Sequence, residues 1–183
     1  PELFIVMATQ NPIEQEGTYP LPEAQLDRFL MHVVIDYPNA DSELQILRLA
    51  RGEALNVAQE RIEKLSQTDI LAARQEILNL HLSEAVEQYI VQLVMASRRP
   101  EHYGDDLASW IEYGASPRGT IALERCARAH AWLHNKDFVS PDDVQAVAHD
   151  VLRHRILLSF EAEAAGMNVE TVINELIQRV PVI

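Results

Sequence analysis

The sequence has one cysteine and only six glycines among its 183 residues. A single cysteine, Cys126, excludes an internal disulfide and a metal site of the CxxC type. It lies within an apolar helical pattern, which favours a small core residue over a nucleophile. No glycine opens the pattern GxxxxGK followed by Ser or Thr, in which glycines let backbone amides close on phosphates. These residues therefore do not contain a phosphate-binding loop of that type.

Long apolar runs and positive charge are also scarce. No run approaches the ~18 apolar residues that a membrane-spanning helix needs, and no signal-like segment opens the chain. We therefore expect a cytoplasmic protein without a membrane span. The chain has 15 Lys and Arg against 28 Asp and Glu, a formal net charge of −13. Such a surface repels phosphate backbones, and no basic stripe with interleaved aromatics is found, so binding of nucleic acid is disfavoured.

Turn-forming residues near the N-terminus join an apolar run to a short amphipathic helix. Leu3–Met7 predicts a buried strand, and the polar stretch Thr9–Pro12 follows at its carboxyl end, where α/β sheets bind ligands. A helix is predicted over Pro22–Phe29. Met31–Asp36 predicts a second strand, which makes a βαβ piece of a larger parallel sheet. Two strands cannot form such a sheet alone, so this part should expose apolar faces.

The rest of the chain is almost wholly helical in pattern, so we predict a mainly α fold. Tyr37–Asn39 breaks the pattern and divides a unit of residues 1–39 from a helical unit of residues 40–183. Glu101–Tyr113 is the least periodic stretch, and we expect a loop that lays aromatic rings over the bundle. Polar capping residues predict the helix starts, namely Ser42, Thr68, Ser83, Ser116 with Pro117, Ser140 with Pro141, and Asn168.

One of these helix starts carries a cation where a helix disfavours it. Arg118 lies in the first turn after Ser116, and there it opposes the helix dipole by roughly 0.3 to 1 kcal/mol. This cost, uncompensated in the sequence, indicates that an anion belongs at this position. A helix N-terminus with a guanidinium is suited to phosphate.

Three stretches together resemble the MoxR family of AAA+ ATPases. They are ATQNP at residues 8–12, EGTYPLPEAQLDRF at residues 16–29 and YGASPRG at residues 113–119, and the resemblance continues to the C-terminus. It implies that residues 1–39 end the α/β nucleotide-binding core and that residues 40–183 form the helical lid. We expect the ATP-binding half to be missing and the chain to be a C-terminal fragment, inactive by itself.

The same resemblance assigns roles to three residues. Asn11 matches sensor 1, which positions the attacking water or contacts the γ-phosphate of ATP; without the resemblance, an Asn-Pro turn would be the simpler interpretation. Arg28 matches the arginine finger that completes a neighbouring subunit's site, against a local ion pair with Asp27 or Glu23. Arg118 matches sensor 2, which contacts ATP bound by its own subunit. Thr9 and Gln10 remain supporting candidates with structural roles favoured.

Metal binding is not indicated. The acidic residues Glu14, Glu16 and Glu23 suit a solvated loop better than a cation site, which needs converging carboxylates. His130 and His134 have zinc-compatible spacing, but no glutamate of an HExxH pattern and no third ligand accompany them. We interpret them as surface histidines.

The resemblance implies an ATPase that uses ATP and Mg²⁺ in a homo-oligomeric ring, expected to be a hexamer. It also implies a bacterial protein with a chaperone-like function, which assists the maturation of partner proteins or metal insertion. Proteins with a von Willebrand factor A domain are the expected partners. Two alternatives stay open: a non-enzymatic helical interaction module and a magnesium-chelatase-like AAA+ subunit.

Overall fold

The computed structural model describes residues 3–10, 21–55 and 64–182, and within them most residues are helical. The mainly α fold predicted from the sequence is confirmed. The elements in chain order are α1 (Glu23–Leu26), α2 (Ala40–Ala54), α3 (Gln67–Asn79), α4 (Glu84–Arg98), the 3-10 turn η2 (Pro100–His102), α5 (Asp105–Trp110), β1 (Ile111–Tyr113), α6 (Pro117–Leu133), α7 (Pro141–Leu152), β2 (Leu157–Leu158), α8 (Phe160–Ala164) and α9 (Val169–Arg179).

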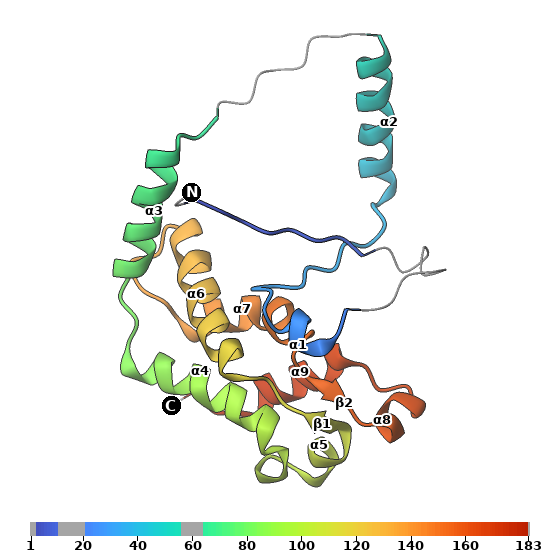
Figure 1. Cartoon of the computed structure of the whole chain (residues 1–183), viewed down its shortest axis with the longest axis vertical. Helices are drawn as coiled ribbons and strands as arrows, with labels where there is room; N and C mark the ends of the chain where they lie inside the picture. The colour runs from blue at the N-terminus through green and yellow to red at the C-terminus, as the bar shows by residue number, and fades with distance from the viewer. Residues whose placement is uncertain (1–2, 11–20, 56–63, 183) are drawn as a thin grey trace.

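The core lies between four of these helices. Helices α4, α6, α7 and α9 pack against one another (Figure 1), because each presents an apolar stripe at helical spacing. Their central side chains are wholly shielded from solvent, among them Tyr89, Leu93, Leu123, Val151 and Leu176. The strong apolar stripe of α9 is therefore buried inside this bundle.

Most helix starts form as the sequence predicts. Ser83, Ser116, Ser140 and Asn168 each precede their helices, and Asn168 Oδ1 accepts the Thr171 amide at 2.9 Å. Two predicted caps are wrong. Asn39 rather than Ser42 caps α2, and Ser66 rather than Thr68 caps α3. In both helices the actual cap lies upstream of the predicted one, and its side chain accepts the backbone amide three residues later. In α3 the Asp69 side chain also accepts the Ser66 amide, which completes a capping box.

The predicted loop over Glu101–Tyr113 is instead structured. Gly104 has a φ of 144°, and two aspartates directly after it begin α5. The chain then forms β1, which pairs antiparallel with β2, with Ile111 opposite Leu158. Trp110 packs against the core as expected, whereas Tyr113 is exposed. Periodicity missed this region because each of its elements is shorter than two helical turns.

The two predicted strands of the N-terminal unit do not form. Residues 3–10 and 31–39 follow an irregular course without strand pairing, and the only two-stranded sheet in the described parts is β1 with β2. Apolar side chains are exposed in both segments, with Ile5 at 87% and Ile35 at 90%. Parallel strands need neighbouring strands for their amides and their apolar faces, and in the described parts of the chain no strand pairs with these segments. The predicted exposure of apolar faces in this part is thus confirmed.

Helix α2 stands apart from the bundle (Figure 1), and none of its residues is buried. Helix α3 contacts α6 at the edge of the bundle. Among the described helices, none is both long and apolar enough to cross a membrane.

Candidate functional site

Arg28 lies in the turn that follows α1. The helix ends at Leu26, earlier than predicted, and the backbone continues as a turn in which the Arg28 amide donates to the Gln25 carbonyl at 3.2 Å. The Arg28 side chain is exposed, and it has no hydrogen bond or ion pair with any described residue. The alternative interpretation, a local ion pair with Asp27 or Glu23, is therefore not what this structure shows. Its charge faces solvent.

Arg118 lies in the first turn of α6, and α4 fixes the position of that turn. Ser97 Oγ accepts the Ala115 amide at 3.0 Å, and Arg98 Nε donates to the Ala115 carbonyl at 2.6 Å. Ser116 then caps α6 by accepting the Arg118 amide at 3.1 Å. The end of one buried helix thus positions the start of the next.

Gly114 permits this close approach. A Cβ atom at this position would lie 2.3 Å from the Ser97 carbonyl oxygen, which belongs to the backbone and cannot rotate away. The glycine of YGASPRG therefore has a packing reason that the sequence pattern alone does not reveal.

Replacing Gly114 by alanine is expected to lower the free energy of unfolding by about 2 kcal/mol, because the added methyl group forces α4 and the loop before α6 apart. Urea denaturation followed by circular dichroism measures the change. Gly52→Ala is the matched control, since nothing lies within 4 Å of its added Cβ atom and α2 is helical there. A Gly114→Ala variant as stable as the control would contradict this account.

Asp27, the residue directly before Arg28, binds Arg118. Its carboxylate accepts Ser116 Oγ at 2.9 Å on both oxygens, Arg118 Nη1 at 3.0 Å and Arg155 Nε at 3.2 Å. Partial burial alone would raise the pKa of Asp27, but hydrogen bonds from Arg118 and Ser116 and the charge of Arg155 outweigh it, so this pKa lies below its ordinary value. The anion expected beside Arg118 is therefore, in this structure, a carboxylate of the same chain.

Arg155 is the residue that sequence reasoning missed. Its side chain is 2% exposed, and it donates to the carbonyls of residues 27 and 30 at 3.2 and 3.3 Å and also to those of Phe29 and Val151. It thereby holds the turn with Arg28 against the end of α7. One signal was available: Arg155 follows Val151 at i+4 and so continues the apolar face of α7. An arginine on a core-facing position needs several acceptors.

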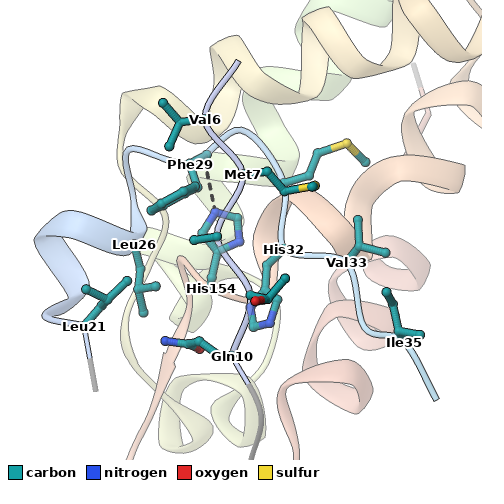
Figure 2. A pocket seen from close by; sticks show the side chains of 13 residues that line it. Val6, Met7, Gln10, Leu21, Leu26, Phe29, His32, Val33, Ile35 and His154 are labelled. Carbon is teal, nitrogen blue, oxygen red and sulfur yellow. Dashed lines mark hydrogen bonds between the residues drawn. The ribbon is translucent and has the colours of Figure 1, made fainter. Parts of the chain in front are cut away.

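Neighbouring contacts extend this docking of the turn. His154 Nε2 lies 3.2 Å from the Phe29 carbonyl (Figure 2). The His32 amide donates to the Asp150 carbonyl at 2.8 Å. Burial, with the nearby charge of Arg155, lowers the pKa of His154 to about 4, so the ring is neutral at physiological pH. A hollow of about 350 Å³ lies beside it, lined mostly by apolar side chains such as Val6 and Val33.

The remaining candidate residues either make contacts of a structural kind or lie outside the described residues. Asn11, Glu14 and Glu16 fall outside, so the structure does not place sensor 1. His130 Nδ1 lies 2.8 Å from Asp143 Oδ1, and no group of three or more metal-ligating side chains occurs among the described residues. Cys126 is buried, and this burial raises its pKa to about 11, which agrees with a core residue.

Two family models match separate parts of the chain. Residues 1–31 match the ATPase family associated with various cellular activities (AAA), and residues 107–176 match the AAA lid domain. The chain is 42% identical over 182 residues to the chaperone MoxR1 of Mycobacterium tuberculosis, which covers 98% of this chain and 47% of that protein. The chain belongs to the MoxR family of AAA ATPases.

Two other proteins are also similar to this chain. A crystal structure of a presumed ATPase from Cytophaga hutchinsonii is 44% identical and superposes with a TM-score of 0.88 over 95% of this chain and 52% of its own. The magnesium-chelatase 38 kDa subunit of Acidiphilium rubrum is more distant, at 28% identity over 93% of this chain and 46% of that subunit. The chain therefore spans about half the length of these relatives.

Proposed function

We propose that this chain supplies two arginines to the ATP sites of a MoxR-type ATPase ring. One observation carries the proposal: the carboxylate of Asp27, the residue directly before Arg28, binds Arg118 at the first turn of α6, so the turn that carries Arg28 is joined to the start of α6. Arg118 is 55% exposed and Arg28 is exposed, so phosphate can reach both. A guanidinium at a helix N-terminus is suited to a terminal phosphate.

In this proposal the ATP and Mg²⁺ lie between subunits of a ring, expected to be a hexamer. Arg118 contacts the γ-phosphate of the nucleotide bound by its own subunit, and Arg28 neutralises charge on the phosphoryl group in the neighbour's site. Asn11 positions the attacking water or contacts the γ-phosphate. Residues 1–39 then end the nucleotide-binding core, and residues 40–183 form the lid.

In this proposal the phosphate-binding loop comes from outside these 183 residues. The strand that precedes this loop would cover the exposed apolar side chains of residues 3–7 and 31–36. The chain alone should therefore not hydrolyse ATP. The work of the ring is proposed to be chaperone-like maturation of partner proteins or metal insertion, with von Willebrand factor A domain proteins as partners. The relative named as a chaperone supports this direction.

Calorimetric titration of the full-length protein tests the proposal. Arg118→Gln should weaken ATP binding by roughly 10- to 100-fold, because a charge-assisted hydrogen bond to the γ-phosphate is lost. ADP binding should change much less, since ADP has no γ-phosphate. Arg125→Gln, an exposed arginine on the same helix, is the control and should leave both affinities unchanged.

Two experimental results would favour one of the alternative functions. A folded full-length protein that binds no nucleotide would favour the non-enzymatic interaction module, for which the unburied α2 offers a surface. Copurification with the other subunits of a magnesium chelatase would favour that enzyme, whose 38 kDa subunit is the more distant relative.

A further inference from the structure

The Arg118 side chain has only one partner among the described residues, and that partner is Asp27. The ion pair is a single contact of 3.0 Å between Nη1 and Oδ2, which leaves the rest of the guanidinium free. Because a carboxylate and a phosphate oxygen bind the same donors of an arginine, Asp27 occupies the place that a phosphate would take.

We propose that Asp27 is a positioning residue that competes with the terminal phosphate of ATP for Arg118. This inference rests on the proposed function and adds to it. Without ATP, Asp27 holds Arg118 against the turn that carries Arg28. When ATP binds, its γ-phosphate takes Arg118, and the link between the two arginines opens.

The burial of the groups shows why this contact can open while the others persist. The Arg118 side chain is 55% exposed, and an exposed ion pair contributes little because water screens it. Asp27 is 17% exposed and keeps Ser116 and the buried Arg155 when Arg118 leaves. The departure of Arg118 therefore does not leave a buried carboxylate without partners.

The same contacts link the two arginines of the site. Ser116 and Arg118 belong to the start of α6, so a shift of this helix start reaches the Asp27 carboxylate directly. Arg28 is the next residue, and its turn has no other side-chain tie to α6 in the described parts of the chain. A change at the nucleotide of one subunit thus reaches the residue proposed to act on the neighbour's nucleotide.

The test is a set of nucleotide titrations of the full-length protein. Asp27→Asn is nearly isosteric and removes the charge that competes with phosphate, so ATP should bind roughly 3- to 5-fold more tightly. ADP affinity should stay the same. Asp27→Ser removes the charge with less bulk and carries the same expectation, so a folding defect in one variant does not prevent the test. Asp27→Glu retains the charge and should keep the wild-type ratio of ATP to ADP affinity.

The double variant Asp27→Asn with Arg118→Gln separates competition from a purely structural role. Its ATP affinity should equal that of Arg118→Gln alone, because no arginine remains for which to compete. If Arg118→Gln weakens ATP binding but neutral variants of Asp27 leave it unchanged or weaker, the competition is refuted and the proposed function stands. If Arg118→Gln leaves ATP affinity unchanged, the proposed function itself is refuted.

Discussion

Full-length protein with Arg28→Ala is expected to hydrolyse ATP at least roughly 10³-fold more slowly, the loss typical of a missing arginine finger. The affinity for ATP should stay close to that of the wild-type protein. The Arg28 side chain is exposed and has no partner among the described residues, so its removal should not disturb the fold. Steady-state kinetics give kcat, and calorimetry gives the ATP affinity. Loss of ATP binding in a folded Arg28→Ala protein would contradict the role of a finger.

Mixed rings test whether the two arginines serve different subunits. Neither Arg28→Ala nor Arg118→Ala should be active alone. In a mixed ring, an Arg28→Ala subunit with intact Arg118 can adjoin an Arg118→Ala subunit with intact Arg28, which restores a complete site at that interface. Because ring interfaces are head-to-tail, random mixing of equal amounts should restore up to roughly a quarter of the activity. Failure of mixing to restore any activity, when co-assembly is shown, would place both arginines in the site of one subunit.

The second large effect is expected on stability, from Arg155→Met. This change keeps the apolar volume but removes the buried charge that Asp27 and four backbone carbonyls share. Removing one partner of a buried ion pair leaves acceptors without donors, and we expect the free energy of unfolding to fall by about 3 kcal/mol. Urea denaturation of the purified chain measures this loss.

Arg125→Met provides the control, because Arg125 is exposed on α6 and should change the stability by less than about 0.5 kcal/mol. Hydrogen exchange supplies a local readout. The His32 amide, bound to the Asp150 carbonyl at 2.8 Å, should exchange faster in Arg155→Met because the turn undocks from α7. Unchanged stability together with unchanged exchange would show that Arg155 does not hold the turn.

Local features of the helical bundle could be predicted because their causes are local. Ser83, Ser140 and Asn168 lie directly before apolar stripes at helical spacing, and a cap needs only the amides of the next turn. The stretch of α5 and β1 could not be predicted in this way. Its short strand exists because β2, more than forty residues later, pairs with it.

The two N-terminal segments show where prediction from local sequence fails. Leu3–Met7 and Met31–Asp36 have the composition of buried strands, yet they form none, because a strand is made by its neighbours as much as by its own residues. The same holds for the site. The sequence motifs in which they lie indicated Arg28 and Arg118, but the contact between Arg118 and Asp27 forms only because the chain between these two residues folds back.

The amino-acid sequence by itself determined the mainly helical fold, the helix starts with nearby caps and the membership in the MoxR family. These properties depend on residue type and on spacing along the chain. Only the tertiary structure decided that Asp27 binds Arg118, that Arg155 is buried under the turn that carries Arg28 and that Gly114 must lack a side chain. Each of those depends on atoms brought together from distant segments, and burial determines what such contacts contribute to stability.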